Sequence, residues 1–165
     1  MKALLDFEYL EIVNNILNDE KFKDLDRCLH HGTTRYEHAI RVSYLSYKIA
    51  KKNNLDYITT ARAGLLHDFF NNEGSSMFER FKSTFTHPSL AVENAKEIFN
   101  ITEKESKIIR SHMFPINLTL PRSMEAWIVT ISDKIVFLKE ISLSTCYKLR
   151  YATNLFILIL LNFIK

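Results

Sequence analysis

Residues 65–70 read LLHDFF, an apolar run that is interrupted by a histidine and an aspartate side by side. The apolar residues on either side predict a buried helix, where polar side chains are rare. A buried polar group without a partner costs about 1–3 kcal/mol or more. His67 and Asp68 therefore need a partner in the interior, and the surrounding sequence indicates what it is.

The composition of the chain predicts a fold made of helices. Its 165 residues, 47% of them hydrophobic, suffice for one domain with a single core. Only three glycines and three prolines interrupt the chain, which favours long helices with short connections over strands joined by tight turns. We therefore expect one all-α domain over residues 1–165. The helices are expected near residues 3–18, 35–53, 56–70, 88–99, 102–113, 121–141 and 144–163.

Charge and cysteine content exclude several classes of protein. The net charge of +3 is small and evenly spread, so we expect no nucleic-acid partner. Cys28 and Cys146 are far apart and form no Cys-x-x-Cys pair, which indicates neither a disulfide framework nor a thiolate metal site. A reducing cytoplasm fits this pattern. Acidic residues interrupt the apolar pattern of residues 1–17, so we expect a first helix there rather than a signal peptide.

The most apolar stretch is NLFILILLNFIK at residues 154–165. Its apolar run is much shorter than the ~20 residues that span a bilayer, so we expect no transmembrane segment. We expect a buried terminal helix or a homodimer contact over residues 144–163, with anchoring at a membrane surface as the alternative.

Two segments outside the expected helices are candidates for substrate contact. HHGTTR at residues 30–35 leads into the second helix, and NNEGSSMFERFKSTFT at residues 71–86 is long enough for a lid or a substrate-binding segment. The alternative for the second segment is a short extra helix around Met77 to Phe81.

Several histidines and one further aspartate face inward at helical spacing. His38, for example, shares a stripe with Val42, Leu45 and Ile49. His87 precedes Pro88, a preferred first residue of a helix, so we expect it at a helix N-terminus. One metal centre would satisfy all these groups together, because imidazole and carboxylate bind iron, manganese and zinc without thiolates. The inward groups are His38, His67, Asp68, His87, His112 and Asp133.

The sequence strongly resembles the HD-domain metal-dependent phosphohydrolases. Five segments carry the family's ligands in the family's order: YEHAIRVSYLSYKIA, AGLLHDFF, THPSLAVENA, IIRSHMFP and WIVTISDKI. The resemblance covers about residues 30–140 and implies a compact bundle of about six or seven helices. It also implies a first metal site of His38, His67, Asp68 and Asp133. In the family's binuclear members, Asp68 would bridge to a second site with His87 and His112.

The resemblance further implies hydrolysis of a phosphoester or phosphoanhydride in a small, nucleotide-like substrate by metal-activated water. Asp68 and His67 are the expected catalytic residues, with one or two divalent metals, iron or manganese before zinc, nickel, cobalt or magnesium. We expect substrate contacts from Arg35, His31 and Lys134, which lie close to the ligands in sequence.

Two departures and two alternatives bear on the substrate. The cyclic-dinucleotide phosphodiesterases of the family carry a lysine where this chain has Asn71, and their Gly-Tyr-Pro signature is absent. Both departures argue against that substrate class. The same ligand set serves a di-iron oxygenase in a few relatives, and a nucleotide-sensing module without turnover is the other alternative. Oxygen consumption, compared with anaerobic phosphate release, would separate these functions.

Overall fold

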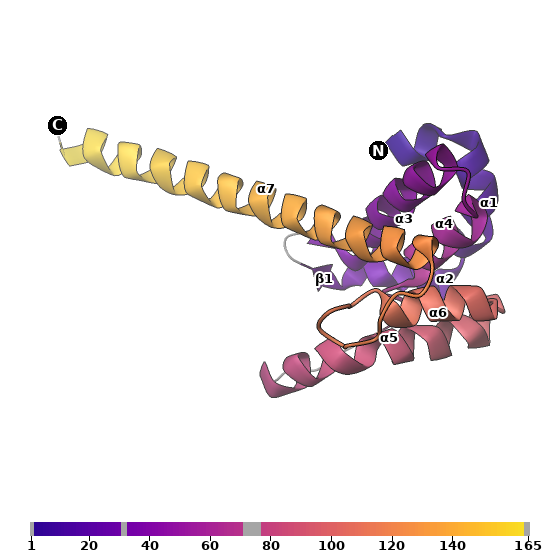
Figure 1. Ribbon diagram of the computed structural model, residues 1–165. Helices are drawn as coiled ribbons and strands as arrows, with labels where there is room; N and C mark the ends of the chain where they lie inside the picture. The colour runs from indigo at the N-terminus through magenta and orange to yellow at the C-terminus, as the bar shows by residue number, and fades with distance from the viewer. Residues whose placement is uncertain (1, 31–32, 71–76, 164–165) are drawn as a thin grey trace.

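The computed structural model describes residues 2–30, 33–70 and 77–163, which form a helical bundle with one small hairpin (Figure 1). The expected all-α fold is confirmed, because nearly all of the regular structure in these residues is helical. The hairpin pairs two short antiparallel strands directly before the helix that carries His38. In chain order the elements are η1 (Lys2–Leu5), α1 (Phe7–Leu17), α2 (Glu20–Lys23), η2 (Asp24–Arg27), β1 (Leu29–His30), β2 (Thr33–Thr34), α3 (Arg35–Lys52), α4 (Tyr57–Leu66), α5 (Met77–Phe99), α6 (Glu103–Ser111) and α7 (Met124–Phe163).

Helices α3 and α4 pack against each other at the centre of the bundle. The turn between them uses Asn54 with a φ of 53°, a left-handed conformation that asparagine tolerates better than most residues. A buried chain of hydrogen bonds ties the pair to α1. The Tyr9 hydroxyl donates to Ser43 Oγ at 2.9 Å, and Ser43 Oγ donates to the Ala61 carbonyl at 2.6 Å. These bonds hold the two helices that bring His38 and the His-Asp pair together.

Gly64 of α4 faces the backbone of α3 at Ser43. A Cβ atom at this position would lie 3.1 Å from the Cα of Ser43 and 3.5 Å from Ser43 N. We expect Gly64→Ala to lower the free energy of unfolding by about 1–3 kcal/mol, because backbone atoms cannot move aside as a flexible side chain can. Glycine to alanine inside a helix ordinarily stabilises by up to about 1 kcal/mol, so the sign is diagnostic. Urea unfolding followed by circular dichroism measures it, and a gain in stability would contradict the tight contact.

Helix α5 begins much earlier than the sequence indicated. It runs from Met77 through Pro88 to Phe99, so the expected helix start at Pro88 is wrong and His87 lies inside the helix. Residues 77–86 are therefore helical, which agrees with the alternative of a helix around Met77 to Phe81 and not with a long loop, although this helix is continuous with the one that follows. Proline removes one backbone donor, and the buried side chains of Ala91, Val92 and Ala95 hold the helix against the core beyond it. Residues 71–76, with Asn71, lie outside the described residues.

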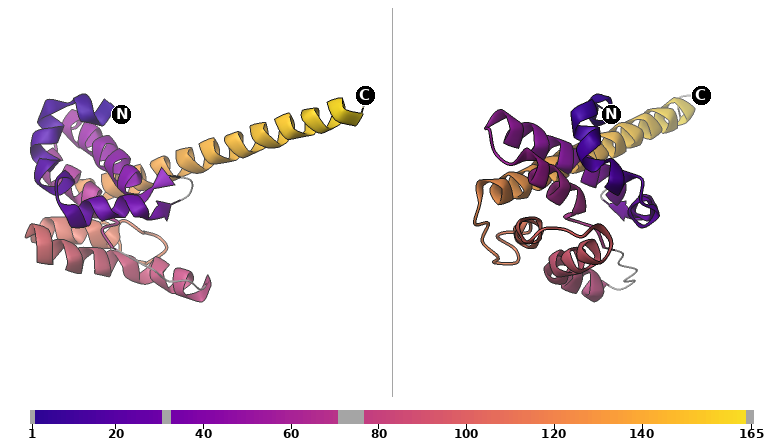
Figure 2. Two further views of the ribbon diagram at one scale, coloured as in Figure 1. Left: turned by 180° about the vertical axis from the view of Figure 1, so that it is seen from behind. Right: turned by 90° about the vertical axis from the view of Figure 1, so that its right-hand side faces the viewer.

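Helix α7 runs without a break from Met124 to Phe163, so the separate helices expected at 121–141 and 144–163 are one. No glycine or proline occurs between them to end the first helix. The N-terminal half of α7 packs on α3, α4 and α6, whereas its C-terminal half extends away from the bundle (Figures 1 and 2). Most side chains of residues 144–163 lie outside the described part of the chain, so the expected burial or homodimer contact of this segment stays a prediction. Neither α7 nor any other helix in the described ranges has an apolar segment long enough to span a membrane.

Candidate metal centre

The six inward groups lie together in the interior, and each is carried by one of five helices or by the residues that follow it. His38 comes from the first turns of α3, His87 from the middle of α5 and Asp133 from α7. The other three follow helix ends, since α4 ends at Leu66 and not near residue 70 as expected. All four histidines and Asp68 are buried, and the Asp133 side chain is 15% exposed.

His67 and His112 are oriented in the same way by the helices that precede them. Each caps the C-terminus of its helix, and its Nδ1 bonds to the carbonyl oxygen three residues earlier. His67 Nδ1 lies 2.8 Å from Gly64 O, and His112 Nδ1 lies 2.7 Å from Ile109 O. The last carbonyls of a helix have no N–H donors within it, so they are available as acceptors to these rings. With Nδ1 donating to the carbonyl, Nε2 of each ring is left as an acceptor toward the centre.

The first half of the centre contains His38, His67 and Asp133, whose ligand atoms all lie within 4.8 Å of one another. Asp133 Oδ1 lies 3.1 Å from His38 Nε2 and 3.7 Å from His67 Nε2. Burial opposes the charged form of His38, but hydrogen bonds to Asp133 and Glu140 raise its pKa to about 10. Burial also opposes ionisation of Asp133, yet its interactions with the His38 and His67 rings hold the pKa of that carboxyl well below its usual range. A cation that bound His38 Nε2 would have to displace a proton.

The second half of the centre is formed by Asp68, His87 and His112. Asp68 Oδ1 lies 3.4 Å from His87 Nε2 and 3.6 Å from His112 Nε2, and the two Nε2 atoms lie 3.1 Å apart. The other oxygen, Oδ2, lies 3.7 Å from His67 Nε2. Burial, together with repulsion from His67, lowers the pKa of His112 to about 3, which keeps its ring neutral. Asp68 thus directs one oxygen toward each half of the centre.

These groups fit divalent metals by two independent criteria. His67 Nε2 is fully buried and has no hydrogen-bond partner among the described residues, a state that a metal would relieve. Two ligands at right angles on one ion, with bonds of about 2.1 Å, lie about 3 Å apart, close to the 3.1 Å between His87 Nε2 and His112 Nε2. The donors are imidazole and carboxylate alone, which suits iron, manganese, zinc and related ions.

Glu140 is a neighbour of the centre that the sequence analysis did not select. Its Oε2 lies 2.8 Å from His38 Nδ1, and its Oε1 accepts a hydrogen bond from Arg41 at 2.7 Å. Burial alone would raise the pKa of Glu140, but the bonds from His38 and Arg41 lower it. Glu140 follows Asp133 by seven residues, which is two helical turns, so the two carboxylates share one face of α7. That spacing was the signal available in the sequence.

Arg35, an expected substrate contact, lies at the start of α3 beside the second half of the centre. Its guanidinium carbon lies 4.0 Å from the centroid of the Phe70 ring, and it donates a hydrogen bond to the Phe70 carbonyl. The Phe70 ring in turn stacks on His87 at 5.0 Å between centroids. Arg35 Nε is buried and has no partner in the described chain. One donor of this cation is therefore uncommitted within the described residues.

Lys134 and His31 were the other expected substrate contacts. Lys134 Nζ donates to the backbone carbonyls of His112 at 3.0 Å and Thr130 at 3.4 Å. Burial lowers the pKa of Lys134, an effect that the neighbouring Asp133 opposes. In this arrangement Lys134 fixes the backbone of His112. His31 lies outside the described residues.

Comparison with known proteins identifies the family of this chain. The sequence model of the HD domain family matches residues 35–138, which is more than half of the chain and includes all six inward groups. No curated protein and no solved structure matches the chain significantly. The match and the buried cluster of histidine and aspartate together show that this chain belongs to the HD-domain family, whose members are in general metal-dependent phosphohydrolases.

Proposed function

We propose that the protein hydrolyses a phosphoester or phosphoanhydride bond of a small, nucleotide-like substrate with the help of two divalent metals. In this proposal His38, His67, Asp68 and Asp133 hold the first metal, and Asp68, His87 and His112 hold the second. We keep iron and manganese as the preferred ions from the resemblance to the family, and the donor set of nitrogen and oxygen without sulfur suits both.

One observation carries the proposal of two metals, namely the orientation of the Asp68 carboxylate. Its Oδ2 lies 3.7 Å from His67 Nε2, while its Oδ1 lies 3.4 Å from His87 Nε2. A carboxylate with one oxygen toward each of two imidazole groups suits a bridge between two ions about 3.5–4 Å apart. If a single metal bound at the first half, His87 and His112 would remain a buried pair of imidazoles that bind no metal.

The residues of the chain then have distinct tasks. Divalent cations bound here would supply Lewis acidity, which lowers the pKa of a coordinated water and polarises a phosphate oxygen. Asp68 orients the attacking water between the two halves. The water oxygen loses a proton and bonds to phosphorus as the bond to the leaving oxygen breaks, and the leaving oxygen gains a proton in its place. Arg35 neutralises charge on the phosphate oxygens, and Lys134 acts through the backbone of His112. We keep His31 as a candidate substrate contact from its position before α3.

The test is to remove metal from the purified protein, reload it anaerobically with Mn²⁺ or Fe²⁺, and measure phosphate release. The substrates should include nucleoside monophosphates, dinucleoside polyphosphates and a chromogenic phosphodiester. We expect turnover of at least one of them by the reloaded protein and none after a chelator is added. The metal-free protein is the matched control, because its chain is identical.

Three results would overturn the proposal in different ways. Absence of bound iron, manganese, zinc, cobalt or nickel after reloading removes the metal centre itself. Oxygen consumption by the Fe²⁺ form, without phosphate release from any substrate, identifies a di-iron oxygenase. Nucleotide binding with neither reaction identifies a sensing module.

A further inference from the structure

His38 is held differently from the other two histidines of the centre whose Nδ1 contacts are described. His67 and His112 bond to carbonyls at the ends of their own helices, whereas His38 lies near the start of α3. Carbonyl oxygens there point toward the C-terminus of the helix and accept its own hydrogen bonds. The acceptor for His38 Nδ1 comes from α7, where Glu140 Oε2 lies 2.8 Å away, 102 residues along the chain.

The Glu140 carboxylate is itself fixed on its other side. Its side chain is only 5% exposed, and Arg41 donates a hydrogen bond to its second oxygen, Oε1, at 2.7 Å. The Arg41 guanidinium also donates to Glu37 Oε2 at 2.9 Å and to Thr33 Oγ1 at 3.1 Å. Each oxygen of Glu140 thus has one partner, and the partner on the outer side is anchored by two further groups. The carboxylate cannot rotate without breaking one of these bonds.

We propose that Glu140, held by Arg41, is a positioning residue that aims His38 Nε2 at the first metal position. A carboxylate that accepts from Nδ1–H selects the tautomer with its lone pair on Nε2, which here lies 3.1 Å from Asp133 Oδ1. A charged acceptor also makes the ring a stronger ligand than a carbonyl would. This inference rests on the metal site of the proposed function and adds to it two residues that touch no metal.

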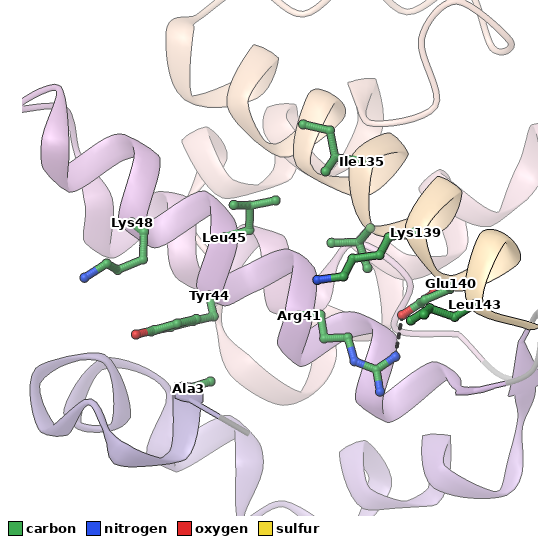
Figure 3. Close-up of a pocket in the computed structure, with 10 residues that line it drawn as sticks. Ala3, Arg41, Tyr44, Leu45, Lys48, Ile135, Lys139, Glu140 and Leu143 are labelled. Carbon is green, nitrogen blue, oxygen red and sulfur yellow. Dashed lines mark hydrogen bonds and ion pairs between the residues drawn. The ribbon is translucent and has the colours of Figure 1, made fainter.

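The pair is reachable from solution through a cavity of about 560 Å³ between α3 and α7. Figure 3 shows Arg41 and Glu140 joined on its wall, with Lys139 close to them and Tyr44 and Leu45 further along α3. The Arg41 side chain is 36% exposed. In a variant without the Arg41 side chain, a small cation added to the solution could therefore occupy the place of the guanidinium. This provides a direct test of the role of Arg41.

The first experiment titrates Mn²⁺ into metal-free protein in competition with a chelating dye. We expect Glu140→Gln to weaken one of two binding equivalents by about 10- to 100-fold and to leave the other unchanged, because only the half with His38 loses its charged acceptor. Glu105→Gln is the matched control. Glu105 is also a buried carboxylate that pairs with an arginine, since Arg62 Nε lies 2.6 Å from its Oε1. In the described chain it contacts no group of the centre. Its replacement should leave both Mn²⁺ affinities unchanged.

The second experiment uses Arg41→Ala, which also decides the matter if Glu140→Gln does not fold. We expect the same equivalent to weaken, and millimolar methylguanidinium to restore part of the lost Mn²⁺ affinity. The additive should not change the affinity of the parent protein. A purely structural role for Arg41 predicts lower thermal stability without recovery of metal binding.

The outcomes separate this inference from the function on which it rests. A parent protein that binds no Mn²⁺ overturns the proposed metal site and this inference with it. A parent that binds Mn²⁺, together with folded Glu140→Gln or Arg41→Ala variants of the same affinity within about twofold, overturns the positioning role alone. Weakening of both equivalents in the Glu105→Gln control would assign the effect to general loss of stability.

Discussion

Replacement of Asp68 by alanine is expected to reduce phosphate release by about a thousandfold or more and to remove most of the bound metal. Its two oxygens lie 3.7 Å from His67 Nε2 and 3.4 Å from His87 Nε2, so one substitution takes a donor from both halves of the centre. Elemental analysis of reloaded protein measures the metal, and phosphate release from the best substrate measures the activity.

Asp56→Asn is the matched control for Asp68→Ala, because both residues flank α4. Asp56 caps the N-terminus of that helix by accepting a hydrogen bond from Thr59 N, and it pairs with Lys104 at 2.9 Å. Asparagine caps a helix as well as aspartate does, so this replacement loses only the exposed ion pair, should cost less than about 1 kcal/mol of stability, and should leave metal content unchanged. If Asp68→Ala binds as much metal as the parent, the bridging role of Asp68 is wrong, whatever happens to activity.

The double change of His87 and His112 to alanine is expected to lower the metal content from two ions per chain to one. The two Nε2 atoms lie 3.1 Å apart beside Asp68 Oδ1, and the first half of the centre keeps His38, His67 and Asp133. Turnover should fall steeply while circular dichroism shows the same helix content. Titration of Mn²⁺ and of Fe²⁺ under anaerobic conditions gives the number of equivalents.

The control for this pair is His30→Ala, which removes a histidine that is not among the proposed ligands and should retain two equivalents. A parent protein that saturates at one equivalent with both ions contradicts the binuclear site. His87 and His112 would then be better interpreted as groups that contact substrate or transfer protons beside a single ion.

Helical periodicity indicated that His38 and Asp133 face inward, and the reason is geometric. Both residues lie within their helices, where the 3.6-residue repeat fixes the face on which a side chain lies. Glu140 lies on the face of Asp133 by the same rule, but a glutamate next to Lys139 is typical of a solvated surface. Its burial depends on Arg41, a contact across 99 residues that no local pattern contains.

The ends of helices were the features that the sequence predicted least well. Pro88 suits the first turn of a helix, yet α5 is helical on both sides of it. At the end of α4 the apolar pattern of LLHDFF persists beyond Leu66, since Phe69 and Phe70 are buried although the helix has ended. Burial and helical conformation are separate properties, and an apolar pattern reports the first of them.

The wide spacing of the ligands along the chain has a consequence for the order of events during folding. His38 and Asp133 are 95 residues apart, and a single ion held by both would close that whole segment into a loop. An unfolded chain would lose conformational entropy to close it, and this loss grows with the logarithm of loop length. The folded bundle has already brought the two ends together, so an ion binds it far more tightly than it binds the open chain. Uptake of the first metal is therefore expected to follow the docking of α7 on α3 and not to guide it.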